Sequence, residues 1–458
     1  MAQTTRPGKL SIMSKKIVII GANAAGVDAA VAARKTDREA EITLLTKDKV
    51  GAYSRCGLPF VLGGHIPSFE NLVVYPPNFY RMMKFDLKQE TTATNVVTKT
   101  KTVETESKDG KHEILEYDIL ILATGAYPFQ LPLEGIDKEG VLTLHTLSDG
   151  QKLAQAMQKA KAAVVIGSGL VGLEATEAFM ERGIKTTVVE MLPSVLPRLL
   201  DPDMSSNVQK RFEENGVTFI LGKPAEAILG EKKAKAVTVG GEEVPADIVL
   251  NAAGVRPNVE LAQKAGIAVG ETRGIKTNSR MQTSNENVYA AGDCAETTHI
   301  VTGKPALPLL GSAAVKMGKV AGTNAAGGDA VYPGTLFSWV SRIFHLDVGG
   351  VGLTEFWAKQ VGVDVVVGKL TSKTRADYFP GGLPIKIKIV VEKKTKHVVG
   401  GQIVGGEEVT QRINALALAI QNHISVYDLA KADTCYAPSV CEAWEPLVLA
   451  AEIAHRRL

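Results

Sequence analysis

One cysteine stands in a segment whose neighbours favour thiol chemistry. The segment runs Tyr53-Ser-Arg55-Cys56-Gly57-Leu58-Pro59-Phe60, which is polar and glycine-rich rather than apolar. Arg55 brings a positive charge next to Cys56, and a helix that begins near Cys56 would direct its N-terminal dipole at the sulfur. Both features lower the pKa of a thiol and favour the reactive thiolate. A lone cysteine is more often a small apolar core residue, but this setting predicts a redox-active Cys56.

A glycine-rich turn later in the chain has the spacing of a nucleotide-binding motif. It runs Gly167-Ser-Gly169-Leu170-Val171-Gly172 directly after the apolar run 163–166, and it satisfies the full Gly-x-Gly-x-x-Gly pattern. Such a turn lets a diphosphate approach the N–H groups at the start of the following helix. A glycine-rich turn can be no more than a turn, but the strand, the helix pattern and a later acid together predict a nucleotide site.

That acid, Glu190, closes the second expected strand of this unit, where a carboxylate can accept hydrogen bonds from both ribose hydroxyls. Met191 and Leu192 come next, so no basic residue stands ready to bind a 2′-phosphate. We therefore expect NADH to be preferred over NADPH at this turn.

A turn near the N-terminus repeats the design with weaker spacing. It runs Gly21-Ala-Asn23-Ala24-Ala25-Gly26, with Asn23 at the position of the middle glycine. The second expected strand of this unit is followed by Thr46 and Lys47, and Thr46 offers one hydrogen bond where a carboxylate would offer two. The spacing predicts a second nucleotide here, but these residues alone do not identify it.

Each turn must be held in a βαβ unit, between a short buried strand and an Ala-rich helix. The chain of 458 residues is long enough for about three domains. Residues from about 331 onward lack such a turn and show strand patterns over 363–367 and 385–391, a helix pattern over roughly 411–423 and a last helix. We expect this part to be a separate domain of mixed sheet and helices.

The overall composition argues against several classes of protein. Hydrophobic residues make up 45% and charged residues 22%, and the net charge is +3 with Lys and Arg scattered among acids, so no nucleic-acid partner is expected. No apolar run approaches the roughly 20 residues of a membrane span. Four cysteines without a disulfide or metal-ligand pattern fit a reducing compartment. We expect a cytoplasmic protein without a metal or membrane contact, with residues 1–13 as a disordered lead.

Three further motifs make the chain resemble the FAD-containing pyridine nucleotide-disulfide oxidoreductases. One segment, which ends in Thr124-Gly125, resembles the family's strand between two nucleotide domains, and the segment around Gly254 resembles the return crossing. The segment 288–294 resembles the family's second flavin motif. The resemblance implies FAD at the first turn and NADH at the second, with Asp293 bonded to the ribityl chain and Glu174 near the nicotinamide. Arg55 and the residues of both turns become candidate cofactor-binding residues.

The single cysteine narrows the resemblance to one subgroup. Two-cysteine members carry Cys-x-x-x-x-Cys near the flavin, whereas this chain has Cys56 alone. It thus resembles coenzyme A-disulfide reductases, NADH-dependent persulfide or polysulfide reductases, NADH oxidases and NADH peroxidases. The subgroup's Ser-Phe-x-x-Cys has Ala52 and Tyr53 here, so the serine hydroxyl is missing. Peroxidases place a histidine in the first turn, and residues 22–25 contain none, which disfavours that activity.

The implied activity passes electrons from NADH through FAD to a disulfide, persulfide or polysulfide at Cys56, with coenzyme A species as the leading carriers. Two alternatives stay open: an NADH oxidase in which Cys56 cycles through a sulfenate, and a redox-sensing or electron-delivery flavoprotein that serves a protein partner. Arg34 and Lys35, at the end of the first helix, could meet the phosphates of a coenzyme A carrier, although a solvated helix end is the simpler explanation. The histidines give no catalytic lead.

The C-terminal part resembles the family's dimerisation domain, which implies a homodimer. Tyr378 and Tyr436 match tyrosines that disulfide-reducing relatives place over the partner subunit's cysteine, where a phenol can donate a proton to a leaving thiolate. They are otherwise ordinary half-buried tyrosines. Cys435 and Cys441 flank this region, and one hypothesis makes one of them a resolving thiol across the dimer, with interface packing as the simpler explanation. Cys294 is expected to be a packing residue.

The expected fold is α/β, with two Rossmann-like nucleotide-binding domains, for FAD and NAD, and a C-terminal α+β dimerisation domain. The expected boundaries are 14–125 and 260–330 for the FAD-binding domain, 126–259 for the NADH-binding domain and 331–458 for the dimerisation domain.

Overall fold

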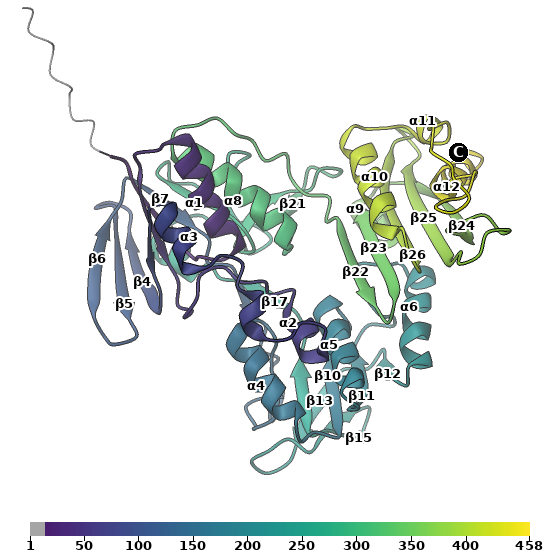
Figure 1. Cartoon of the computed structure of the whole chain (residues 1–458), viewed down its shortest axis with the longest axis horizontal. Helices are drawn as coiled ribbons and strands as arrows, with labels where there is room; N and C mark the ends of the chain where they lie inside the picture. Colours follow the sequence, from purple (N-terminus) through teal and green to yellow (C-terminus); the bar gives the residue numbers. More distant parts are fainter. Residues whose placement is uncertain (1–13) are drawn as a thin grey trace, which may run out of the picture.

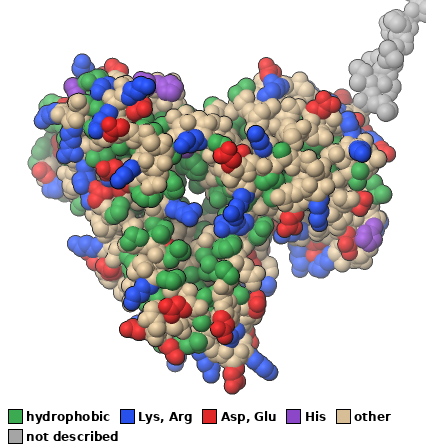
Figure 2. Space-filling model, turned by 180° about the vertical axis from the view of Figure 1, so that it is seen from behind, with side chains coloured by type: hydrophobic (Ala, Val, Ile, Leu, Met, Phe, Trp, Pro, Cys, Tyr) green, Lys and Arg blue, Asp and Glu red, His purple; other side chains and the backbone are tan. Residues whose placement is uncertain are grey.

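The structure, a computed structural model, describes residues 14–458, so the lead expected over residues 1–13 lies outside the described residues. The described part of the chain forms three lobes; the first is built from two segments that flank the second in sequence, and the last one carries the C-terminus (Figure 1). Seen from behind, the surface is hollowed where the lobes meet, with Lys and Arg side chains at the edge of the hollow (Figure 2).

The first lobe is built on a five-stranded parallel sheet. Its strands are β1 (Lys16–Ile20), β2 (Glu41–Leu45), β3 (Phe85–Lys88), β7 (Ile119–Leu122) and β19 (Val288–Ala290), in the order β19-β7-β1-β2-β3. Helices α1 (Ala24–Thr36) and α8 (Gly311–Ala325) lie side by side (Figure 1). The two helices are so close that a Cβ added at Gly322 would lie 1.9 Å from the carbonyl oxygen of Ala29, so the contact requires glycine there. Strand β1, helix α1 and the parallel strand β2 follow one another around the first glycine-rich turn, as the βαβ pattern predicts.

Shorter elements complete this lobe. They are a three-stranded antiparallel sheet of β4 (Thr91–Val97), β5 (Thr102–Ser107) and β6 (His112–Glu116), helices α2 (Leu58–Gly63), α3 (Pro77–Met82) and α7 (Glu260–Lys264), the 3-10 helix η1 (Phe69–Leu72), and strands β18 (Ile275–Lys276), β20 (Ala295–Thr298) and β21 (Pro305–Ala306). Two short antiparallel strands, β8 (Ala126–Pro128) and β17 (Val255–Pro257), carry the chain to the second lobe and back.

The second lobe repeats the parallel architecture. Its sheet has the order β12-β11-β10-β16-β9, with β9 (Val141–Leu142), β10 (Ala162–Ile166), β11 (Lys185–Glu190), β12 (Thr218–Leu221) and β16 (Ile248–Asn251). Its helices are α4 (Leu147–Met157), α5 (Leu170–Glu181) and α6 (Pro202–Glu214), and its small antiparallel sheet contains β13 (Ala225–Leu229), β14 (Ala236–Val239) and β15 (Glu242–Pro245). The apolar run of β10 is buried, as a strand inside a parallel sheet requires.

The third lobe is an antiparallel sheet with helices on it. The sheet has the order β22-β23-β26-β25-β24, with β22 (Trp339–Ile343), β23 (Leu346–Gly352), β24 (Val365–Lys373), β25 (Pro384–Glu392) and β26 (Val398–Gly405). Its helices are α9 (Glu355–Val361), α10 (Val409–Gln421), α11 (Val426–Leu429) and α12 (Pro446–His455). The alternating residues Ile385, Ile387 and Ile389 of β25 share one core with Leu416 and Ile420 of α10.

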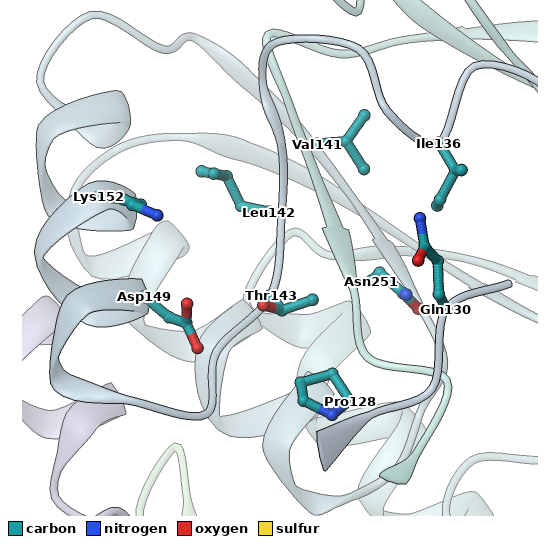
Figure 3. A pocket seen from close by; sticks show the side chains of 9 residues that line it. All are labelled: Pro128, Gln130, Ile136, Val141, Leu142, Thr143, Asp149, Lys152 and Asn251. Carbon is teal, nitrogen blue, oxygen red and sulfur yellow. The ribbon is translucent and has the colours of Figure 1, made fainter. Parts of the chain in front are cut away.

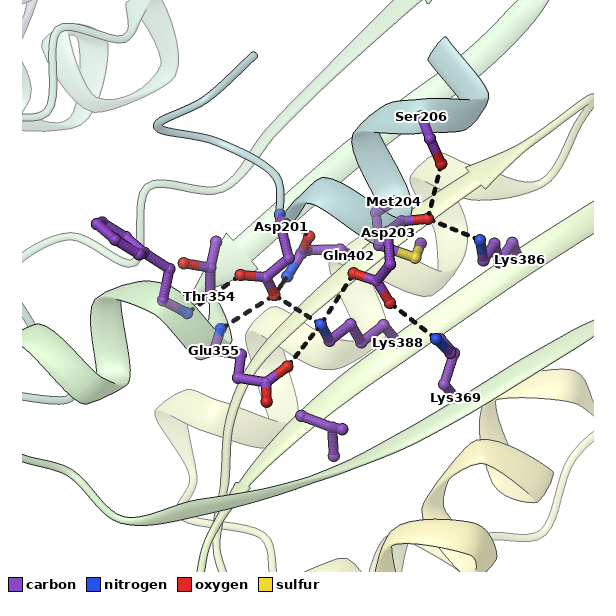
Figure 4. Close-up of polar contacts among 12 residues, drawn as sticks. Asp201, Asp203, Met204, Ser206, Thr354, Glu355, Lys369, Lys386, Lys388 and Gln402 are labelled. Atoms are coloured by element: carbon purple, nitrogen blue, oxygen red, sulfur yellow. Dashed lines mark hydrogen bonds and ion pairs between the residues drawn. The ribbon is translucent and has the colours of Figure 1, made fainter. Parts of the chain in front are cut away.

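A buried lysine joins the second and third lobes (Figure 4). Lys388 of β25 is 2% exposed, and its Nζ lies 3.0 Å from a carboxylate oxygen of Asp201, 3.1 Å from one of Asp203 and 2.8 Å from one of Glu355. The carboxylate of Asp201, just before α6, also accepts from Nε2 of Gln402 at 2.6 Å. A buried charge of this kind requires its partners, so these contacts fix the orientation of the two lobes.

The α/β prediction is confirmed, with two parallel Rossmann-like sheets followed by an antiparallel C-terminal domain. The helix expected over roughly 411–423 is α10, and the strands expected over 363–367 and 385–391 are β24 and β25. The domain boundaries stay predictions. In the part of the chain that the structure describes, no helix has the length and apolar character needed to cross a bilayer.

Candidate active site

Cys56 lies in a tight turn just before α2, where the first lobe meets the second. The turn is closed by the N–H of Gly57, which donates to Oγ of Ser54 at 3.2 Å, and by the N–H of Leu58, which donates to the carbonyl of Arg55 at 3.1 Å. The end of α2 is bonded to α5, because Nε of Arg182 donates to the carbonyl of Leu62 at 2.8 Å. Cys56 as a whole residue is exposed, whereas the protein packs around its sulfur.

The expectation that the pKa of Cys56 is lowered is wrong for the protein without its cofactors. The pKa of Cys56 is raised, first by the protein packed around the sulfur and then by the negative charges of Glu174 and Asp293, while Arg55 offsets only part of the rise. The helix begins at Leu58, two residues after Cys56, and is only six residues long, so it has little dipole to direct at the sulfur. The sulfur is therefore influenced by the charge of Glu174, which is assigned to the NADH site, and by that of Asp293, which is assigned to the FAD site.

Arg55 is held by a histidine that the sequence did not single out. Its Nη1 lies 2.7 Å from Nε2 of His145, which itself lies 2.8 Å from the carbonyl oxygen of Ala126. A guanidinium can only donate and a carbonyl oxygen can only accept, so Nε2 either accepts from Arg55 or donates to Ala126, according to the tautomer of the ring. Burial, followed by the charge of Arg55, lowers the pKa of His145 to about 4, which keeps the ring neutral near pH 7. His145 lies 90 residues from Arg55, and no local pattern links the two.

Glu174, in the first half of α5, has a second partner that the sequence did not reveal. Its Oε1 accepts a hydrogen bond from Oγ of Ser341 in β22 at 2.7 Å. Burial raises the pKa of Glu174, and the Ser341 bond opposes that rise. A residue of the third lobe therefore contacts the carboxylate expected near the nicotinamide.

The first glycine-rich turn has the shape of a diphosphate cradle. Gly21 has φ +110°, and a Cβ there would lie 2.1 Å from the carbonyl oxygen of Ala123, while a Cβ at Gly26 would lie 1.8 Å from the oxygen of Gly21. Asn23 caps α1 by accepting the N–H of Ala24 on Oδ1 at 2.9 Å. Its buried Nδ2 has no hydrogen-bond partner among residues 14–458. An unpaired buried donor at a helix N-terminus fits an anionic ligand such as the diphosphate of FAD.

The remaining candidates for FAD surround this turn. Buried Thr46 directly follows β2, before Lys47, and its Oγ1 accepts the N–H of Asp48 at 3.2 Å. Oγ1 of Thr124 donates to the carbonyl of Asn258 at 2.6 Å and so fastens the outgoing chain to the returning chain. Asp293 follows β19, and burial raises its pKa while Arg55 lowers it.

Two packing details bear on the FAD candidates. A Cβ at Gly292 would lie 2.9 Å from that of Ala25, so the two expected flavin motifs pack together. Nε of Arg55 is a second buried donor with no partner in the described chain. These residues fit FAD, which would be held by the turn, Thr46 and Asp293.

The second turn is built in the same way and leaves room at its middle glycine. Gly167 has φ +108°, and a Cβ at Gly172 would lie 2.2 Å from its carbonyl oxygen. Apart from adjacent residues of the chain, no described atom lies within 4 Å of a Cβ built on Gly169 or on Gly254. Open space beside Gly169, at the start of α5 where Leu170 and Val171 begin the helix, fits the approach of a diphosphate.

Glu190 ends β11 and is tied to the second turn. Its Oε2 accepts from N and Oγ of Ser168, both at 3.0 Å, and its Oε1 accepts from the N–H of Leu192 at 2.9 Å. The carboxylate is therefore fixed beside the turn, with one negative charge where the ribose is expected.

The structure brings together the two tyrosines predicted from the third lobe. The hydroxyls of Tyr378 and Tyr436 are hydrogen-bonded to each other, although the residues are 58 positions apart. Both side chains are exposed.

Two other sequence hypotheses are addressed directly by contacts. The guanidinium of Arg34 is not free for a carrier, because it donates to four backbone carbonyls, those of Arg38, Ala40, Met83 and Lys84, whereas Lys35 is exposed at the helix end. Cys294 is fully buried, and its thiol donates to the carbonyls of Leu122 and Ala291 at 3.4 Å, as expected of a packing residue.

A cavity of about 330 Å³ lies in the second lobe, and none of the predicted site residues is in its lining (Figure 3). Its lining consists of Pro128, Gln130, Ile136, Val141, Leu142, Thr143, Asp149, Lys152 and Asn251. Among residues 14–458 no group of three or more His, Cys, Asp or Glu side chains has the geometry to hold a metal ion.

Comparisons with known proteins agree with this architecture. An NADH oxidase of Methanocaldococcus jannaschii is 44% identical over 97% of this chain and 99% of that protein. An NAD(P)H coenzyme A polysulfide/persulfide reductase of Pyrococcus horikoshii is 34% identical over 96% of this chain and 98% of that protein. The solved structure of an NAD-dependent persulfide reductase from A. fulgidus has a TM-score of 0.94 and 38% identity, covering 96% of this chain and 83% of that one.

Fold, site and relatives together define an NAD(P)H-dependent flavin oxidoreductase. The family model for pyridine nucleotide-disulphide oxidoreductases matches residues 15–318, and the model for the dimerisation domain of the same proteins matches residues 340–448. The chain belongs to this family, which confirms the resemblance drawn from its motifs. Membership implies FAD and NAD(P)H as cofactors, and the dimerisation domain suggests a homodimer.

Proposed function

We propose that this protein uses NADH to reduce a small disulfide, persulfide or polysulfide at Cys56, with coenzyme A species as the leading carriers. One observation carries the proposal: Cys56, an exposed residue, lies just before α2 at the junction of the two nucleotide-binding lobes, and the charges of Glu174 and Asp293 both raise its pKa. A sulfur in that position could receive electrons from FAD bound in the first lobe and could react with an acceptor that arrives from solvent.

Bound FAD would accept a hydride from NADH and make two electrons available to sulfur. The Cys56 thiolate attacks one sulfur of the acceptor R–S–S–R, so that a mixed disulfide forms and one R–S⁻ leaves. The leaving sulfur takes a proton, and the second R–S⁻ leaves when two electrons return Cys56 to the thiolate. Arg55 contributes a positive charge next to Cys56 that lowers the pKa of the thiol and so favours the thiolate.

The proton donor that we assign to the leaving thiolate is Tyr436 of the partner subunit, with Tyr378 as its hydrogen-bond partner. Support comes from the bond between the two hydroxyls, which orients one phenol by the other. The exposure of both rings leaves them available to a second copy of the chain.

For the nucleotide, we propose NADH over NADPH. The fixed carboxylate of Glu190 would accept hydrogen bonds from ribose hydroxyls and would repel a 2′-phosphate.

A second candidate is an NADH oxidase, because a relative with 44% identity carries that name. In it, Cys56 would cycle through a sulfenate with oxygen as the oxidant.

Anaerobic NADH consumption separates the candidates. The purified protein is given coenzyme A disulfide, inorganic polysulfide or no acceptor, and each reaction is repeated in air. Turnover without oxygen that depends on a sulfur acceptor is the expected result. Turnover only in air would replace the proposal by the oxidase, and turnover under neither condition would favour a role that needs a protein partner.

A further inference from the structure

Two cysteines that the proposed reaction does not use lie in one irregular segment of the third lobe. Residues 431–445, between α11 and α12, contain no helix or strand and include Cys435 and Cys441. The thiol of Cys441 donates to the carbonyl oxygen of Cys435 at 3.3 Å, and the N–H of Cys441 donates to the carbonyl of Ala437 at 2.9 Å. The segment therefore folds back so that the side chain of Cys441 rests on the backbone of Cys435.

This arrangement brings the two side chains close to each other in the fold. Covalent geometry separates the carbonyl oxygen and the Cβ of one residue by about 3 Å, so the sulfur of Cys441 lies within about 6 Å of Cβ of Cys435. A disulfide needs its two Cβ atoms about 3.5–4.5 Å apart. Formation of the bond needs a movement of the loop, and that movement breaks no strand or helix.

The two thiols also differ in accessibility. Cys435 is exposed and Cys441 is partly exposed, whereas Cys294 is buried and bonded to two carbonyls. An external disulfide therefore meets Cys435 first. The C-terminal end of the loop is fixed, because Glu445 is held by Arg412 through two hydrogen bonds of 2.5 and 2.9 Å.

We propose that Cys435 and Cys441 form a thiol–disulfide pair, oxidised within one chain by small disulfides of the class that the enzyme reduces. The Cys435 thiolate attacks R–S–S–R, giving a Cys435–S–S–R mixed disulfide and R–S⁻, which takes up the proton that Cys435 released. The Cys441 thiolate then attacks the Cys435 sulfur, the Cys435–Cys441 bond forms, and the second R–S⁻ leaves with the proton of Cys441. Two thiols are oxidised and one disulfide is reduced to two thiols.

The closed ring would contain Tyr436, so its formation moves this phenol relative to Tyr378. When small disulfides are abundant and oxidise the two cysteines, the contact between the hydroxyls of Tyr378 and Tyr436 therefore changes. The proposal rests on the proposed function only for the source of the oxidant.

Peptide mapping of the full-length protein under non-reducing conditions tests the pair. The Cys56→Ser variant is incubated anaerobically with coenzyme A disulfide, so that the proposed reaction at Cys56 cannot contribute. The peptide holding both cysteines should lose two hydrogens, and its alkylation by N-ethylmaleimide should fall about tenfold or more. Cys435→Ser and Cys441→Ser should each abolish the change, and Cys294→Ser, as the matched control, should not.

Other outcomes overturn the pair. A stable coenzyme A adduct on Cys435 with Cys441 still open to alkylation would show that the second thiol does not resolve the first. In the protein with Cys56 intact, a covalent dimer linked through Cys56 and Cys435 would instead support a resolving thiol across the subunits. Because the mapping uses a variant without Cys56, failure of the pair leaves the proposed function standing, and failure of the Cys56 reaction leaves the pair standing.

Discussion

The hydroxyl of Ser341 donates to Oε1 of Glu174 across 2.7 Å, which joins the first strand of the C-terminal sheet to the helix after the second glycine-rich turn. Further along the same helix, Oε1 of Glu177 accepts the N–H of Phe344 at 2.8 Å. The hairpin of β22 and β23 therefore holds two carboxylates of α5. The third lobe thus helps to shape the site where the nicotinamide is expected.

Replacing Ser341 by Ala should disturb the site of NADH without unfolding the protein. Loss of one hydrogen bond to a carboxylate costs about 1.5–3 kcal/mol locally, and Glu174 becomes free to turn away from its present position. We expect KM for NADH to rise several-fold with a smaller change in kcat, measured by steady-state kinetics. Ser341→Thr keeps the hydroxyl and should restore KM. Equal kinetics for the Ala variant and the wild type would show that the bond does not position Glu174.

Replacing His145 by Phe should make the Cys56 thiol less reactive. Without its acceptor, Arg55 is no longer held, and the positive charge that lowers the pKa of Cys56 moves away. The thiolate forms only above that pKa, so the rate of alkylation by iodoacetamide should fall near pH 8 and its pH profile should shift to higher pH. His145→Gln keeps an acceptor and should shift the profile less. A pH profile of the Phe variant identical to that of the wild type would contradict the positioning of Arg55 by His145.

Replacing Glu190 by Gln should relax the choice of nucleotide. The amide keeps the shape of the side chain but loses the charge that would repel a 2′-phosphate. We expect the ratio of kcat/KM for NADPH to that for NADH to rise about tenfold, equivalent to about 1.4 kcal/mol. Ser168→Ala, which removes one hydrogen bond to Glu190 and leaves its charge, is the matched control and should retain NADH preference. An unchanged ratio in the Gln variant would remove Glu190 as the determinant.

Replacing Lys388 by Met should destabilise the joint between the second and third lobes. The substitution leaves buried Asp201 and its neighbour Asp203 without their shared cation, and breaking such a buried pair costs about 3–5 kcal/mol. Lys369→Met removes a more exposed partner of Asp203 and should cost about 0–1 kcal/mol. Urea unfolding followed by circular dichroism measures both. Similar midpoints for the two variants would show that the Lys388 network does not hold the lobes together.

The sequence predicted the features that depend on local spacing. The two turns need glycine where a Cβ would strike the backbone, as at Gly21 and Gly172, and such requirements are visible in a single stretch of chain. The strands around them are buried apolar runs, so their positions also followed from local pattern. The same logic correctly placed Cys56 just before a short helix.

The features that sequence reasoning missed depend on contacts between distant elements. His145 and Arg55 are 90 residues apart, and Ser341 and Glu174 are 167 apart, so no periodicity or motif connects them. The direction of the Cys56 pKa was wrong for the same reason. Arg55 is adjacent in sequence and was counted, whereas Glu174 and Asp293 reach the sulfur only through the fold.

The central claim is that Cys56 passes the electrons of NADH to a sulfur acceptor, and its most direct test compares Cys56→Ser with the wild type under anaerobic conditions. With coenzyme A disulfide or polysulfide as acceptor, NADH consumption by the variant should fall at least about a hundredfold, while one equivalent of NADH still bleaches the bound flavin. Undiminished reduction of both acceptors by the Ser variant would contradict the account.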